Sequence, residues 1–217
     1  MKKPKPTSMK HVFQLYAFIF VVWGFYRMLF DLPDHIEELI LKPILWLTPL
    51  IWILRREGLG LSSVGWTWRN LFKSIYLAIG IGMLLAIEGV FINSIKYGSF
   101  NFLKENLTQA MLLGALGISL VTAISEETVF RGFIFARVWK FLKNEWTANI
   151  LTSVMWAVVH LPVTIFVWHY TLEQVIIFMV LTFFFGVVSA IVYARTGNVA
   201  SSVLLHVFWE WPIILFR

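Results

Sequence analysis

Seven ionisable side chains lie within strongly apolar stretches of this chain, where they call for an explanation. A charge at the centre of a bilayer costs about 2.5–3.5 kcal/mol on insertion scales, so such residues need a partner or a function. They are Glu88, Glu126, Glu127, Arg131, His160, His206 and Glu210. The last six fall in three short segments, 125–132, 156–162 and 204–210. These segments are the candidates for chemistry inside a membrane.

The first segment holds two adjacent carboxylates and an arginine. Glu127 and Arg131 are four residues apart, so they share a helix face and we expect an ion pair between them. Glu126 then points to another side and stays free. An unpaired carboxylate in a dry site binds a proton more readily than in water, which suits a general base. The alternative interpretation is a purely structural ion pair at a helix end.

The second and third segments supply two imidazoles. His160 follows Trp156 by one helical turn, and His206 and Glu210 share a face at a spacing of four. On the structural interpretation, these are a satisfied core histidine and a local hydrogen-bonded pair. On the functional interpretation, they join Glu126 from a third helix. Such a set would activate a water, with or without a divalent metal such as zinc on Glu126, His160 and His206.

Other routes to peptide hydrolysis lack their signatures in this chain. The zinc-protease motif His-Glu-x-x-His is absent. The two aspartates, Asp31 and Asp34, lie together in an expected outer loop rather than in two membrane helices. Ser119, within Gly-Ile-Ser-Leu, does not complete Gly-x-Ser-x-Gly, and the chain has no cysteine nucleophile. Chemistry by glutamate and histidine remains.

The elements that must position these residues are apolar helices. Hydrophobic residues make up 59% of the 217 residues, charged residues only 14%, and the mean hydropathy is +0.78, whereas soluble domains carry about 25% charged residues. We predict an all-α polytopic membrane protein with about seven transmembrane helices in one domain, residues 1–217. The expected helices are 11–30, 39–54, 71–95, 107–124, 146–168, 175–194 and 199–216.

Two of these stretches are irregular. The second is short and contains Pro43 and Pro49, so we expect it to be tilted, kinked or re-entrant. The fourth stays apolar through Phe141, which makes it too long for one straight span. We therefore expect a break or a long exit from the bilayer within it.

The charges between the spans predict the topology. With a cytoplasmic N-terminus, 13 of the 18 Lys and Arg residues fall on the inner side, as the positive-inside rule requires. The five on the outer side are Arg27, Lys42, Lys96, Lys104 and Arg217, together with an acidic loop of Asp31, Asp34, Glu37 and Glu38. The net charge of +6 is thus a topology signal, and we expect no nucleic-acid partner.

The three segments together resemble the CPBP family, the CAAX-prenyl-protease and bacteriocin-processing membrane enzymes, also called the Abi family. Its pattern is Glu-Glu-x-x-x-Arg, then Phe-x-x-x-His, then His-x-x-x-Asn/Asp on successive membrane helices. The resemblance covers about residues 107–217. It implies that Glu126 and His160 activate a water, that His206 and residue 210 stabilise the oxyanion, and that Arg131 pairs with Glu127.

The chain departs from the family pattern at two positions. Trp156 replaces the usual Phe and keeps an aromatic wall. Glu210 replaces the usual Asn or Asp, and an ionised Glu cannot donate a hydrogen bond to an oxyanion. This departure raises the alternative that peptidase activity has been lost.

The resulting expectation is an intramembrane endopeptidase of a bacterial plasma membrane, cutting a peptide or a prenylated protein near the cytoplasmic face. Two mechanisms stay open, one without a cofactor and one with a divalent metal such as zinc. Two alternatives stay open. One is a non-catalytic membrane protein for bacteriocin self-immunity, and the other is a small transporter that uses Glu88 and the histidines as a relay.

Overall fold

The computed structural model describes residues 9–97 and 109–215, and these residues form helices joined by short connections. The basic residues Lys2, Lys3, Lys5, Lys104 and Arg217 lie outside the described residues. The elements are α1 (Met9–Leu29), α2 (Asp34–Ile36), η1 (Glu37–Leu41), α3 (Lys42–Glu57), η2 (Leu61–Val64), α4 (Leu71–Tyr97), α5 (Gln109–Glu127), η3 (Thr128–Phe135), α6 (Ala136–Leu142), α7 (Glu145–Val159), η4 (Val163–Val167), α8 (Leu172–Thr196) and α9 (Val199–Leu215). The all-α prediction is confirmed.

Five helical stretches of the described chain are long and apolar enough to cross a membrane. They are Met9–Leu29, Leu71–Ile92, Met111–Leu142, Glu145–Val167 and Leu172–Thr196. The other two expected spans are also helical but shorter, with 16 residues in α3 and 17 in α9. The protein is therefore a multi-pass, all-helical membrane protein, while the total of seven spans and the cytoplasmic N-terminus stay predictions.

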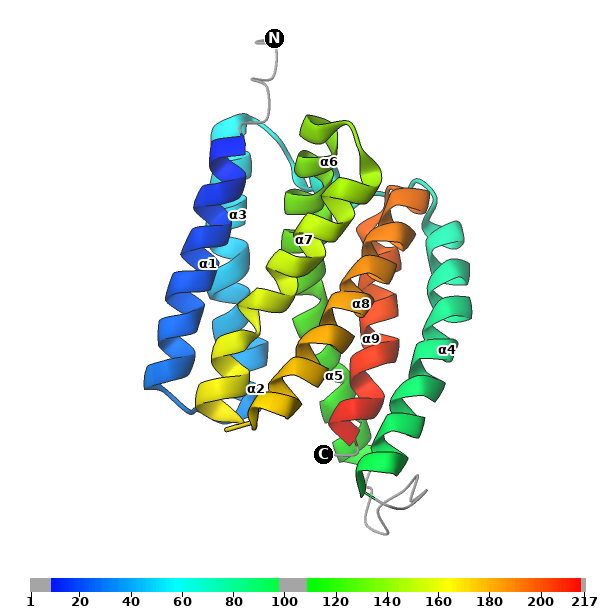
Figure 1. The fold of residues 1–217 in the computed structure, drawn as a ribbon. Helices are drawn as coiled ribbons and strands as arrows, with labels where there is room; N and C mark the ends of the chain where they lie inside the picture. The colour runs from blue at the N-terminus through cyan, green and yellow to red at the C-terminus, as the bar shows by residue number, and fades with distance from the viewer. Residues whose placement is uncertain (1–8, 98–108, 216–217) are drawn as a thin grey trace.

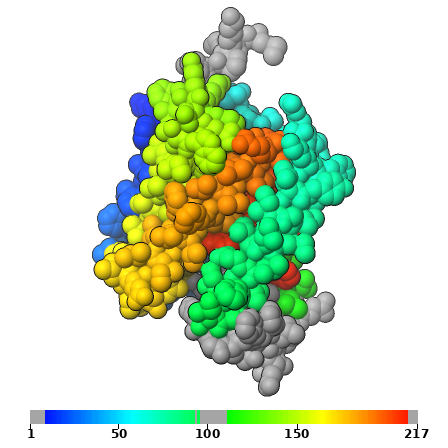
Figure 2. Space-filling model, turned by 45° about the vertical axis from the view of Figure 1, so that its right-hand side comes forward, coloured from blue at the N-terminus to red at the C-terminus, as the bar shows by residue number. Residues whose placement is uncertain are grey.

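The long helices run side by side along one common direction (Figure 1). α9 packs against α4, α5 and α8, and α7 packs against α8. Figure 2 shows α9 between α8 and α4 on one face of the molecule. The chain reverses direction from helix to helix, so α2, η4 and the start of α8 meet at one end of the bundle. The start of α1 and the end of α6 lie at the other end (Figure 1).

The fourth span lacks one of the two features expected of it. There is no break, because α5, η3 and α6 form one uninterrupted helical run from Gln109 to Leu142; the long exit from the bilayer stays a prediction. Its middle section, η3, is π-helical and all eight of its residues are buried. A π-turn keeps the backbone hydrogen-bonded while it adds a residue to the turn, so the wider winding takes the place of a break. Gly132 lies in this section, against the carbonyl of Val64.

The helix boundaries near the site follow from local sequence. The side chain of Asn144 accepts a hydrogen bond from the Thr147 backbone N–H at 2.9 Å and starts α7. Thr171 and Gln174 form a capping box that starts α8. Pro162 has no backbone N–H to donate to a helical hydrogen bond. The helix α7 ends before Pro162, and the π-helical η4 begins directly after it. This change of winding places His160 at the C-cap of α7.

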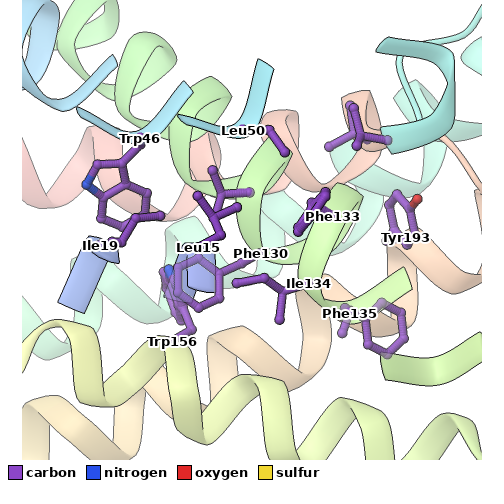
Figure 3. Packing of buried hydrophobic residues seen from close by; sticks show 14 of the residues in the cluster. Leu15, Ile19, Trp46, Leu50, Phe130, Phe133, Ile134, Phe135, Trp156 and Tyr193 are labelled. Atoms are coloured by element: carbon purple, nitrogen blue, oxygen red, sulfur yellow. The ribbon is translucent and has the colours of Figure 1, made fainter. Parts of the chain in front are cut away.

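A cluster of large apolar side chains fills the bundle next to η3. It includes Trp46, Phe130, Phe133, Phe135 and Trp156, each exposed by no more than 1% (Figure 3). The Phe130 ring lies 5.8 Å from the Trp46 ring, centroid to centroid. Close packing of this kind fixes the rotation of the helix that carries Glu126 and Glu127.

Candidate active site

A cavity of about 130 Å³ is lined by residues from the middle of the bundle and from the end that carries α2. Among the residues that line it are Glu126, His160, His206 and Glu210, which come from α5, the end of α7 and α9. Its lining also includes Lys42, the first residue of α3. Residues from four segments that are far apart in the sequence thus meet at one cavity.

Glu126 is a fully engaged carboxylate, only 2% exposed. Its Oε1 accepts a hydrogen bond from Lys42 Nζ at 2.9 Å, and its Oε2 accepts one from Trp156 Nε1 at 2.9 Å. The expectation that Glu126 is free was therefore wrong. The reason is that its main partner comes from another helix, where spacing along α5 gives no information.

His160 lies beside Glu126 with one ring nitrogen available to the cavity. Its Nδ1 is 2.8 Å from the carbonyl oxygen of Trp156, which can only accept, so Nδ1 carries a proton. Its Nε2 is 3.7 Å from Glu126 Oε2. In the neutral ring Nε2 is then the basic nitrogen. The backbone of α7 therefore selects the tautomer that can take a proton from a group in the cavity.

Glu127 lies behind the cavity, where its carboxylate binds three side chains. Arg131 Nε is 3.2 Å from Glu127 Oε2, which confirms the expected ion pair. Ser189 Oγ donates to the same oxygen at 2.7 Å. His206 Nδ1 is 2.9 Å from Glu127 Oε1. Glu127 is 0% exposed, and Arg131 stacks at 4.5 Å from the Trp156 ring centroid.

Glu210 faces the cavity from the last helix. Its Oε2 is 3.9 Å from His206 Nε2, as the spacing of four predicted. Among the described residues, that oxygen has no hydrogen-bond partner although it is buried. A carboxylate that is ionised can only accept here, so position 210 adds an acceptor to the cavity rather than a donor.

Sequence reasoning missed a group of paired charges contributed by the first two long helices. Arg27 pairs with Glu37 and, at 2.9 Å, with Glu38, while Lys42 pairs with both Glu38 and Glu126. The topology prediction assigns Glu37 and Glu38 to an acidic loop and Arg27 and Lys42 to the outer side of the membrane, but it does not predict their burial: Glu37 is 1% and Lys42 5% exposed. The i, i+4 spacing of Glu38 and Lys42 at the start of an apolar stretch was the available signal.

The structure thus divides the six expected site residues into two sets. Glu126, His160, His206 and Glu210 line the cavity, whereas Glu127 and Arg131 support them from behind. Glu88, on α4, is not part of the cavity lining. The small-transporter alternative, which uses Glu88 and the histidines, stays a prediction.

The side chains do not form a metal centre in this arrangement. Within the described part of the chain, no three His, Asp or Glu residues are grouped closely enough to hold an ion. The ammonium of Lys42 already occupies Glu126, and Nδ1 of His206 is directed at Glu127. A second cation at Glu126 would be repelled by Lys42. The conditional metal set Glu126, His160 and His206 therefore fits poorly.

Comparison with known proteins gives one match. Residues 108–212 match the model of a family described as Rce1-like, the type II CAAX prenyl endopeptidases. The match contains the segments 125–132, 156–162 and 204–210, and it leaves out α3, which contributes Lys42 to the cavity lining. No protein of curated function and no solved structure matched the chain.

Proposed function

Because residues 108–212 place this chain in the Rce1-like type II CAAX prenyl endopeptidase family, we propose that it is an intramembrane endopeptidase in which Glu126 and His160 activate the attacking water. The observation that carries this proposal is the 3.7 Å approach of His160 Nε2 to Glu126 Oε2 at the wall of a buried cavity. Two acceptor atoms at that separation suit one water, which would donate a hydrogen bond to each.

The reaction would proceed by general base catalysis. The water oxygen bonds to the carbonyl carbon of the peptide, and one water proton passes to Nε2 of His160. Glu126 stabilises the imidazolium that results, while the Trp156 carbonyl holds Nδ1–H and keeps the ring oriented. His160 then returns the proton to the leaving amine. Removal of such a base lowers rates by about 10²–10⁴-fold.

The substrate is proposed to be a peptide segment that approaches from the α2 end of the bundle. Asp34 and Trp168, at the α2 end of the bundle, line the cavity, whereas Arg55, Lys140 and Arg195 lie at the opposite end of the bundle and do not. If that basic end is cytoplasmic, as the positive-inside rule predicts, the cavity faces outward. This placement favours a peptide on the outer side of the membrane over our sequence expectation of cleavage near the cytoplasmic face.

The proposal is tested by cleavage in proteoliposomes. Wild-type protein is incubated with a mixture of fluorogenic peptides, with and without a prenylated C-terminus, and compared with Glu126→Gln and His160→Gln. We expect hydrolysis by the wild type and a loss of at least about 100-fold in both variants. Lys140→Gln, which makes the same kind of change on an exposed residue, is the matched control. Equal cleavage by wild type and Glu126→Gln would refute the assignment.

The acidic residue at position 210 favours a second candidate, a non-catalytic protein that binds a peptide and confers bacteriocin self-immunity. Glu210 Oε2 is an acceptor without a hydrogen-bond partner among the described residues, so it can accept a hydrogen bond from a peptide N–H. The same oxygen would repel an oxyanion. In this case cells that carry Glu126→Gln would stay as protected from a peptide toxin as cells with the wild type. Loss of protection together with loss of cleavage would support the enzyme instead.

A further inference from the structure

Lys42 is a buried cation that reaches the site from outside the family-matched region. Its Nζ lies 2.9 Å from Glu126 Oε1 and pairs with Glu38, one helical turn earlier. The Trp23 and Trp46 rings flank it at 5.5 and 5.8 Å from their centroids. Ion pairs and aromatic faces hold the ammonium in one place at the cavity wall.

The reaction needs a hydrogen-bond donor at this wall. When water attacks a peptide carbonyl, a negative charge develops on the carbonyl oxygen, and fixed donors must stabilise it. Glu210 cannot serve when it is ionised, and its Oε2 would repel the new charge. Because Nδ1 of His206 donates to Glu127, only its Nε2 faces the cavity, 3.9 Å from that same Glu210 oxygen.

We propose, on the basis of the function proposed above, that Lys42 is a catalytic residue and donates to the oxyanion in place of the residue at position 210. An ammonium has three N–H donors; two serve Glu38 and Glu126, and a third can serve a substrate oxygen. The helix that starts at Lys42 thus completes a site whose other residues lie within 108–212.

The charges balance through the step. Before attack, the Glu126 carboxylate is neutralised by Lys42. As the water oxygen bonds to carbon, the carbonyl π pair moves to oxygen and one proton passes to His160. The new imidazolium, next to Glu126, neutralises that carboxylate instead. Lys42 is then left to neutralise the oxyanion, and no net charge is added to the cavity.

The test uses Lys42→Gln, which keeps hydrogen-bond donors toward Glu126 but removes the positive charge. In the proteoliposome assay we expect kcat to fall by about 100-fold or more, with KM changed less than threefold. Lys42→Arg should retain at least a tenth of the wild-type kcat. Adding Glu210→Asn to Lys42→Gln should raise kcat at least tenfold, since it replaces a repelling carboxylate with a donor. Lys140→Gln is the control.

A binding measurement covers the case in which Lys42→Gln cleaves too slowly for kcat to be measured, and normal binding of the uncleaved amide shows that this variant is folded. A phosphinate peptide, which mimics the tetrahedral oxyanion, is titrated against wild type, Lys42→Gln and Lys42→Arg, and the Kd is compared with that of the matching uncleaved amide. We expect Lys42→Gln to lose tight binding of the phosphinate but to bind the amide normally, while Lys42→Arg binds both.

The outcomes separate the two proposals. If wild type and Glu126→Gln cleave equally, the proposed function fails, whatever Lys42 does. If Glu126→Gln is inactive but Lys42→Gln keeps kcat within threefold, the assignment of Lys42 is overturned while the peptidase stands. A Lys42→Gln variant that loses kcat but is not improved by Glu210→Asn, and that binds the phosphinate as tightly as wild type, would also overturn it.

Discussion

His206 contacts Glu127 and not Glu126: its Nδ1 is 2.9 Å from Glu127 Oε1, deep behind the cavity. The two neighbouring glutamates therefore have different surroundings. Glu126 faces the cavity, with Lys42 and Trp156 as partners. Glu127 binds Arg131, Ser189 and His206 in a fully buried network that connects α5, η3, α8 and α9. The different surroundings predict different consequences of substitution.

Replacement of Glu127 should damage the fold more than replacement of Glu126. Glu127→Ala leaves Arg131 buried without its carboxylate, and breaking a buried ion pair costs about 3–5 kcal/mol. Ser189→Ala removes one hydrogen bond from the same network and should cost about 1 kcal/mol. Thermal unfolding in detergent measures both. A Tm of Glu127→Ala equal to that of Glu126→Gln would contradict this division of roles.

Gly132 should tolerate no side chain. A Cβ there would overlap the carbonyl oxygen of Val64 and come within 3.1 Å of the Val64 Cβ. Overpacking of this kind costs about 1–3 kcal/mol, so Gly132→Ala should lower the Tm. Gly117, in the preceding helix α5, has open space where an alanine methyl group would lie, with no atom within 4 Å, and supplies the matched control. If the two alanine variants have the same Tm, the close contact between Val64 of η2 and Gly132 of η3 does not exist.

The absence of cysteine allows a direct test of which way the cavity faces. Glu173→Cys marks the cavity end at the start of α8, and Lys140→Cys marks the opposite end on α6; both positions are exposed. With the N-terminus in the cytoplasm, a membrane-impermeant maleimide should label Cys at 173 in intact cells and Cys at 140 only after permeabilisation. The reverse pattern would put the cavity on the cytoplasmic side.

Chelation should leave peptide cleavage intact. Lys42 already neutralises Glu126, so the site has no strong requirement for a second cation there. We expect the wild type to keep its kcat within twofold after dialysis against EDTA, and added zinc not to raise it. A zinc peptidase treated in parallel verifies that the chelator works. Loss of activity that zinc restores would show that the cavity rearranges to bind a metal.

Local spacing predicted some contacts of this site and could not predict others. The pairs Glu127–Arg131 and His206–Glu210 lie four residues apart on a helix, and a helix brings such residues together wherever it packs. Lys42 and Glu126 are 84 residues apart, and their contact depends on how two helices pack. For this reason the sequence predicts an acidic loop where Glu37 is in fact buried, and Glu38 partly buried, beside Arg27.

The helical segments were predictable for a related reason, and the π-helical section was not. Apolar length alone marks a membrane helix, and each expected stretch proved helical within the described residues. The winding of η3 depends on the tight packing around Gly132 and Phe130, which composition does not encode. The expected break in this span followed from its length, and length does not distinguish a break from a wider turn.

The paired charges near the start of the chain have a consequence for insertion of the protein into the membrane. Arg27 and Lys42 carry two positive charges, and Glu37 and Glu38 carry two negative ones, all within the first helical hairpin. Their sum is zero before any later helix has been synthesised. These four charges can therefore enter the lipid as an electrically neutral group before the helix that carries Glu126 is inserted.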